Sequence, residues 1–201
     1  MLYRIVRFLL RVYMVIFYRL EVHGASNVPD RGGAIVISNH TSWLDPVVMG
    51  VGLRRQVFFM AKEELFSYPV FGSVLHGVGA FPVRRGRPDR KALRRALKVL
   101  KEGHLLGMFP EGTRSRDGIL RPFEPGVALL AIRAGVPVVP VAIEGYRKFR
   151  PVRARVLEPV DLSAHSDGRA SVRKLARASE EIRRPLAAAL GQDPGVKEGT
   201  A

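Results

Sequence analysis

Short runs of Val, Ile, Leu and Phe alternate with longer polar or amphipathic stretches through the middle of the chain. The runs predict strands over Ala34–Ser38, Val57–Ala61, Gly79–Val83, Leu105–Phe109 and Val138–Ile143. Each run is followed by a loop or by a stretch with helical character. This alternation predicts an α/β fold, a single domain in which helices flank a mixed, largely parallel sheet.

Three of the later stretches have the period of a helix. In the stretch Asp89–Glu102 one face is apolar and the opposite face is basic, and Gly103 is a typical stop signal. Gly126–Ala134 is predicted as a second helix, ended by Gly135-Val136-Pro137. The stretch Ser171–Leu190 is predicted as a last helix with a basic, solvated face.

The first twenty residues predict an amphipathic helix. Arg4, Arg7 and Arg11 follow one another at steps of three and four, so a helix places them on one face and apolar side chains on the remainder. The longest uninterrupted apolar run, Val12–Tyr18, has seven residues, whereas a membrane span needs about 20. The pattern therefore predicts a helix that lies in a lipid interface. The alternative is an amphipathic helix docked on the core with its arginines in water.

Length and charge limit the range of functions. A chain of 201 residues is long enough for one well-buried core and short for two domains. We predict a membrane-association helix over 1–20, a folded domain over 21–190 and a disordered tail over 191–201. The net charge of +15 favours anionic partners, namely nucleic acid, acidic lipid head groups or phosphorylated substrates. Because the chain has no cysteine, disulfides, Cys-ligated zinc and a thiol nucleophile are excluded.

A histidine and an aspartate stand five residues apart where the first predicted strand ends. In a regular helix, His40 and Asp45 would lie about 140° apart around the axis and could not touch. If His40 belongs to the preceding turn, Asp45 can fold back and accept the ring N–H, which would fix the tautomer and stabilise the imidazolium. In the alternative, Asp45 caps a helix that begins with Pro46, and His40 only satisfies a turn.

A second polar segment, residues 108–116, also follows a predicted strand. It offers backbone N–H groups, the hydroxyl of Thr113 and the guanidinium groups of Arg114 and Arg116. These donors suit a phosphate group. The alternative is an ordinary polar turn.

Both segments resemble known motifs. The sequences Asn39-His40-Thr41-Ser42-Trp43-Leu44-Asp45 and Phe109-Pro110-Glu111-Gly112-Thr113-Arg114-Ser115 are similar to the first and third motifs of the glycerolipid acyltransferase family, which includes 1-acylglycerol-3-phosphate acyltransferase. Weaker resemblances follow in order: residues 79–85 are similar to the second motif, residues 136–141 to the fourth, and residues 62–66 to the basic segment between the first two. The resemblance runs from about residue 21 to 160.

There are two departures from the family pattern. Arg84 stands where relatives often carry a polar or acidic residue. In addition, the expected membrane-facing segment is one short helix, whereas some relatives have a longer unit of two helices.

The resemblance implies an enzyme that transfers a fatty acyl group to the free hydroxyl of 1-acyl-glycerol 3-phosphate and forms phosphatidic acid for phospholipid biosynthesis. The donor would be an acyl thioester, either acyl-CoA or acyl carrier protein. His40, held by Asp45, would act as general base. The implied binding residues for the glycerol phosphate are Arg85, Glu111, Gly112, Thr113 and Arg114. Lys62 is a candidate for stabilising the oxyanion or for binding the donor's phosphates.

We predict neither a metal nor a cofactor, because the other four histidines lack an acidic partner in a comparable arrangement. The expected partners are anionic membrane lipids, lysophosphatidic acid and the acyl donor, and the expected location is the cytoplasmic face of the cell membrane, as a peripheral protein. Glycerol 3-phosphate or another lysophospholipid is the alternative acceptor. A basic nucleic-acid-binding module is the alternative of another class, although no known binding motif accompanies the charge. A catalytically inactive lipid-binding protein is a further alternative.

Overall fold

The structure is a computed structural model, and it describes residues 2–84, 89–146, 151–167 and 171–192. Within these ranges the chain forms a seven-stranded sheet with the order β1-β7-β6-β2-β5-β3-β4. The strands are β1 (Glu21–His23), β2 (Ala34–Ser38), β3 (Val57–Lys62), β4 (Phe81–Val83), β5 (Leu105–Met108), β6 (Val138–Glu144) and β7 (Arg153–Val156). All neighbouring strands are parallel except β6 and β7. The predicted mixed, largely parallel sheet is therefore confirmed.

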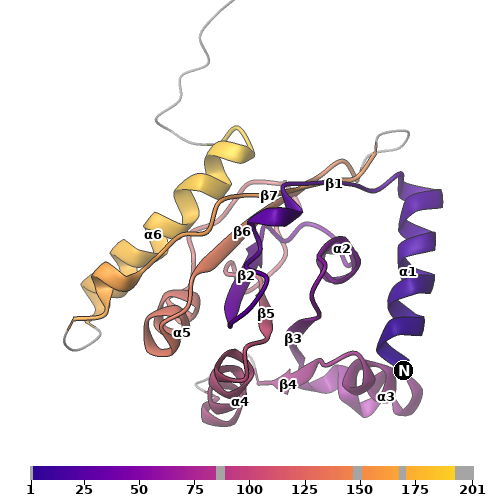
Figure 1. The fold of residues 1–201 in the computed structure, drawn as a ribbon, viewed down its shortest axis with the longest axis horizontal. Coiled ribbons are helices and arrows are strands. Elements are labelled where there is room, and N and C mark those ends of the chain that lie inside the picture. The colour runs from indigo at the N-terminus through magenta and orange to yellow at the C-terminus, as the bar shows by residue number, and fades with distance from the viewer. Residues whose placement is uncertain (1, 85–88, 147–150, 168–170, 193–201) are drawn as a thin grey trace, which may run out of the picture.

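Helices cover both faces of this sheet (Figure 1). One face packs against α1 (Leu2–Tyr18) and α2 (Asp45–Gly52), and the other against α4 (Arg90–Lys101), α5 (Gly126–Ala134) and α6 (Val172–Ala189). The central strand β2 divides its side chains between the two layers: Ala34 and Val36 join the α1–α2 side, whereas Ile35 and Ile37 join the α4–α6 side. Because both faces are buried, this strand is apolar from Ala34 to Ile37, as parallel strands usually are.

The five strands and three later helices predicted from hydrophobic runs are present with small changes at their ends. Within the described residues, two strands and one α-helix were not predicted, namely β1, β7 and α3 (Pro69–Gly77), and neither were three short 3-10 helices. The two strands pair with each other in parallel at the edge of the sheet, and Arg153 Nε lies 2.8 Å from Glu21 Oε2 across the pair. Strands this short and this polar lack the apolar run that identifies a buried strand.

Two arginines of α1, Arg7 and Arg11, bind the end of another helix. Arg7 Nε donates to the carbonyl of Gly50 at 3.1 Å, its guanidinium also donates to the carbonyl of Leu53, and Arg11 donates to Val51 at 3.5 Å. The last carbonyls of a helix lack partners within it and carry partial negative charge, so guanidinium groups stabilise the carboxyl end of α2. The predicted amphipathic helix is therefore present and packs on the core through Met14, as in the alternative, but Arg7 is half-buried against α2 and does not lie wholly in water.

The apolar face of α1 points away from the core. Its exposed side chains are Leu2, Ile5, Phe8, Leu9, Val12, Val15, Ile16 and Phe17. Only Met14 of this helix is fully buried. Among the described residues, no helix is both long enough and apolar enough to cross a membrane.

Candidate active site

The polar segments singled out in the sequence meet at one edge of the sheet. Strand β2 lies between β5 and β6 and is parallel to both, so the loops that follow these three strands emerge side by side. His40 lies in the loop after β2, and Glu111 lies in the loop after β5. In open α/β sheets, ligands usually bind outside the carboxyl ends of the strands.

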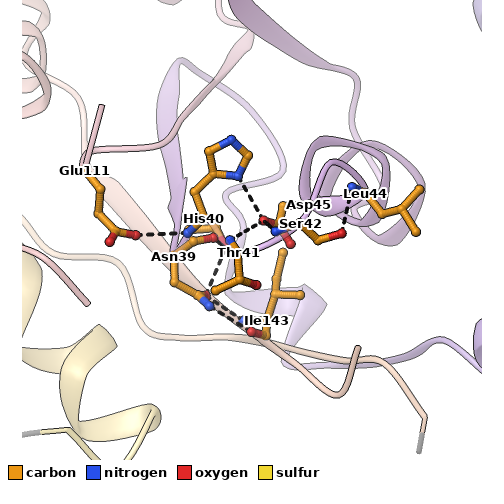
Figure 2. Close-up of polar contacts among 9 residues, drawn as sticks. Asn39, His40, Thr41, Ser42, Leu44, Asp45, Glu111 and Ile143 are labelled. Carbon is orange, nitrogen blue, oxygen red and sulfur yellow. Dashed lines mark hydrogen bonds and ion pairs between the residues drawn. The ribbon is translucent and has the colours of Figure 1, made fainter. Parts of the chain in front are cut away.

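His40 and Asp45 touch directly. His40 Nδ1 lies 2.9 Å from Asp45 Oδ2 (Figure 2). The loop before α2 makes this possible, because His40 lies in the loop and Asp45 is the first residue of the helix. The contact expected from the turn interpretation is therefore present. The capping alternative is wrong, since no side chain caps the start of α2.

The Asp45 carboxylate is fully buried, with a side-chain exposure of 0%. Besides the His40 ring, its Oδ2 accepts the backbone N–H groups of Thr41 and Ser42, each at 2.8 Å. Three donors on one oxygen stabilise a negative charge that burial alone would disfavour. They also fix the orientation of the carboxylate relative to the imidazole ring.

The opposite nitrogen of His40 is available for chemistry. An ionised carboxylate can only accept, so Nδ1 carries the proton that is shared with Asp45 and Nε2 carries a lone pair. Figure 2 shows this second nitrogen pointing away from Asp45. The ring stacks on Phe109, with centroids 4.0 Å apart and planes inclined by 21°. The side chain is 10% exposed, so a small part of the ring faces solvent.

Glu111 joins the two loops. Its Oε1 accepts the backbone N–H of His40 at 3.0 Å, and its Oε2 accepts that of Arg121 at 3.0 Å. In return, the carbonyl of His40 accepts the N–H of Ser115 at 2.7 Å. Glu111 is buried, and its bond to the backbone N–H of His40 helps to hold that residue in place. Its expected role as a ligand of the phosphate stays a prediction.

Asn39 is a positioning residue that the sequence reasoning missed. Its side-chain amide donates to the carbonyl of Ile143 at 2.9 Å, and its carbonyl oxygen accepts the N–H of Ile143 at 2.9 Å (Figure 2). This pair of bonds ties the loop after β2 to the end of β6. A polar amide residue directly after a buried strand was the available signal.

The other predicted binding residues have different surroundings. Gly112 adopts a left-handed conformation with φ of 70°, and Thr113 is exposed. The guanidinium carbon of Arg114 lies 3.9 Å from the ring centroid of Trp43. Lys62 is the last residue of β3, at the same end of the sheet, and its Nζ lies 3.1 Å from Glu64 Oε1. Arg85 lies outside the described residues. The roles assigned to these residues stay predictions.

Tyr146 was also not singled out, because it lies far from the two motifs in the sequence. Burial, and then the negative charge of Asp45, raise the pKa of the Tyr146 hydroxyl. The hydroxyl therefore stays protonated and can donate. Within the described part of the chain, neither this hydroxyl nor Asp45 Oδ1 has a hydrogen-bond partner. The two groups are thus complementary neighbours at the back of the His–Asp pair.

Two of the other histidines differ from expectation, and the first is His23, whose Nε2 lies 3.8 Å from Glu21 Oε2 on the surface. In the second, His165 Nε2 lies 2.8 Å from Glu181 Oε2. The Glu181 side chain is about half exposed, and the pair lies outside the loops that surround His40. Among the residues that the structure describes, no group of three or more His, Asp or Glu side chains is arranged to hold a metal ion. The absence of a metal and of a cofactor stays a prediction from the sequence.

Comparisons with known proteins agree on one family. A sequence model described as "Acyltransferase" matches residues 19–144. The chain is 35% identical over 137 residues to a 1-acyl-sn-glycerol-3-phosphate acyltransferase of Bacillus subtilis, and the match covers 68% of each chain. It is 36% identical over 138 residues to the chloroplastic enzyme BAT2 of Brassica napus, where it covers 67% of this chain and 40% of the relative.

A solved structure agrees with the sequence matches. The crystal structure of the 1-acyl-sn-glycerophosphate acyltransferase PlsC from Thermotoga maritima superposes with a TM-score of 0.72 and 27% identity. The superposition covers 98% of this chain and 83% of that structure. The likeness therefore includes the whole α/β architecture and not only the two motifs.

Proposed function

Because the chain belongs to the 1-acylglycerol-3-phosphate acyltransferase family, we propose that it transfers a fatty acyl group from an acyl thioester to the free hydroxyl of 1-acyl-glycerol 3-phosphate. The product is phosphatidic acid. The observation that carries this proposal is the 2.9 Å contact between His40 Nδ1 and Asp45 Oδ2, which leaves Nε2 as a base beside the loop of residues 111–114.

The proposed reaction needs no enzyme-bound acyl group. His40 Nε2 takes the proton of the acceptor hydroxyl while the hydroxyl oxygen attacks the thioester carbonyl. The new C–O bond forms, the C–S bond breaks, and the departing sulfur receives the proton from the imidazolium. Asp45 stabilises the positive charge that the ring carries between these two transfers. The lack of cysteine agrees with direct transfer.

Two further parts of the proposal concern the substrates. We assign the glycerol phosphate to the loop of Gly112, Thr113 and Arg114, since an arginine can bind a phosphate through two parallel hydrogen bonds. We leave the donor as acyl-CoA or acyl carrier protein, and assign Lys62 to the oxyanion or to the donor's phosphates. Glycerol 3-phosphate and other lysophospholipids are the acceptors to compare.

An assay of thiol release tests the function. The purified chain is given an acyl-CoA or an acyl carrier protein thioester together with lysophosphatidic acid, glycerol 3-phosphate or lysophosphatidylcholine, and the lipid product is identified. We expect turnover with lysophosphatidic acid and formation of phosphatidic acid. Turnover with glycerol 3-phosphate alone would replace the acceptor assignment, and no turnover with any acceptor would overturn the proposal.

We also propose that the exposed apolar face of α1 docks on the membrane as a peripheral contact at its cytoplasmic side. The side chain of Leu2 packs on α3 at Gly77. The packing is so close that a Cβ atom added to Gly77 would lie 2.4 Å from Cδ2 of Leu2. Near this junction, α3 and the residue before it add the exposed side chains of Tyr68, Val70 and Phe71. Apolar surface of this kind, next to a strongly basic chain, suits a bilayer that contains anionic lipid.

Polar substitutions on this face are expected to abolish membrane binding. Phe8→Ser, Ile16→Ser and Phe17→Ser change exposed side chains, so they remove apolar area without opening the core. The triple variant should stay in the supernatant when liposomes of phosphatidylglycerol and phosphatidylcholine are sedimented, while wild type pellets. Val172→Ser, at an exposed apolar position on α6, is the matched control and should pellet like wild type. Unchanged sedimentation of the triple variant would contradict the docking proposal.

A further inference from the structure

Trp43 is an unusual residue for its position. It is the only tryptophan of the chain, and it lies in the loop between His40 and Asp45. Its side chain is 69% exposed, although large aromatic rings are usually well buried. The face of its ring is covered by the Arg114 guanidinium, whose central carbon lies 3.9 Å from the ring centroid.

The stacking has a chemical consequence for Arg114. A guanidinium that lies flat on an aromatic ring uses its face for the cation–π contact, while its N–H groups point outward in the plane of the group. Among the described residues, the Arg114 guanidinium contacts the ring of Trp43 and forms no ion pair or hydrogen bond to an acceptor beside it. The donors are therefore held at a fixed angle and remain available for an anion.

We propose that Trp43 is a positioning residue that holds Arg114 in place for the phosphate group of the acceptor, and so contributes to the choice of a phosphorylated acceptor. This inference rests on the proposed function of the same site. It connects the loop that carries His40 and Asp45 with the loop that binds the phosphate. The distance between the attacking hydroxyl and the phosphate is then set by two loops in direct contact.

The role predicts a specific kinetic pattern. Trp43→Leu keeps an apolar side chain but removes the ring, so Arg114 gains rotational freedom. We expect KM for lysophosphatidic acid to rise by about 3- to 10-fold, since an exposed cation–π contact contributes modestly, with kcat close to wild type. Trp43→Phe, which keeps a ring, should restore most of the loss. An equal fall in kcat for both variants would overturn the inference.

A double-mutant cycle separates this role from simple exposure to lipid. If Trp43 acts through Arg114, then Trp43→Leu should have little effect on KM in an Arg114→Ala background. Soluble hexanoyl lysophosphatidic acid is used as acceptor, so that insertion into a bilayer plays no part. Additive effects of the two substitutions, or an effect that occurs only on vesicles, would show that Trp43 contacts lipid instead.

The single tryptophan also gives a direct readout of binding. Hexanoyl lysophosphatidic acid, added without an acyl donor, should change the fluorescence of Trp43 in a saturable way. The reason is that the phosphate binds the guanidinium that covers the ring and so changes the ring's electrostatic environment. Monohexanoylglycerol, which has the same chain and no phosphate, should cause no change. Arg133→Ala, an exposed arginine at the end of α5, should respond like wild type, and Arg114→Ala should not respond.

These measurements keep two failures apart. Saturable binding without turnover would overturn the proposed function and leave the Trp43 inference intact. Normal turnover, together with an unchanged KM in Trp43→Leu, would overturn the inference and leave the function intact. A fluorescence change of equal size with monohexanoylglycerol, or one that persists in Arg114→Ala, would also overturn it.

Discussion

The His40→Ala substitution is expected to lower kcat by about 10²- to 10⁴-fold, the range by which a positioned general base accelerates proton transfer. KM for lysophosphatidic acid should change little, because the phosphate is assigned to the loop of residues 112–114 and not to the imidazole. Steady-state rates of thiol release, measured at a saturating concentration of acyl donor while lysophosphatidic acid is varied, give kcat and KM separately.

The control for this substitution is His104, which lies at the amino end of β5, whereas His40 follows the carboxyl end of β2. His104 is exposed and precedes β5, and its ring is tilted by 30° against that of Phe58, with centroids 4.9 Å apart. His104→Ala should keep the wild-type rate. Thermal melting of both variants checks that the fold is intact, because the His40 ring also packs on Phe109. A folded His40→Ala protein with near wild-type kcat would exclude His40 as the base.

The central strands were predictable because burial on both faces demands an apolar run, as in the first four residues of β2, Ala34 to Ile37. The edge strands β1 and β7 were not, because each is short and polar and is stabilised by its neighbour in the sheet. Their pairing joins residues that are far apart in the chain, such as Val22 and Ala154. Local pattern carries no information on such partners.

The orientation of α1 shows a second limit. The spacing of Arg4, Arg7 and Arg11 correctly predicted one charged face. It did not say what this face would meet, since that depends on where the carboxyl end of α2 lies. The usual amphipathic helix turns its apolar face to the core and its charged face to water. A helix turned the other way has the same spacing of apolar and charged residues, so the sequence cannot distinguish the two.

At the site, the contact of His40 with Asp45 was one of two interpretations that their spacing left open, and it is present because His40 lies in the loop directly before α2, which begins at Asp45. The supporting groups were harder to find. Glu111 acts on backbone N–H groups and Tyr146 approaches Asp45 from the end of another strand. Their partners are set by the order of strands in the sheet, which the sequence pattern does not specify.

The Asp45→Asn substitution is expected to lower kcat by about 10²- to 10⁴-fold with little change in shape. The amide oxygen can still accept the N–H groups of Thr41 and Ser42, so the loop keeps its two 2.8 Å anchors. What is lost is the negative charge that fixes the His40 tautomer and stabilises the imidazolium after proton transfer. The variant should therefore bind lysophosphatidic acid as wild type does and fail at the chemical step.

Asp161→Asn is the matched control for this change. Asp161 is exposed and accepts the backbone N–H of Ser163 at 2.9 Å. The substitution therefore removes a carboxylate charge that also accepts a backbone N–H, but at a place away from His40. Its kcat should equal that of wild type. Pre-steady-state measurement of thiol release in Asp45→Asn then locates the defect. If the first turnover is as fast as in wild type, the aspartate does not assist the base, and Asp45 only holds the loop together.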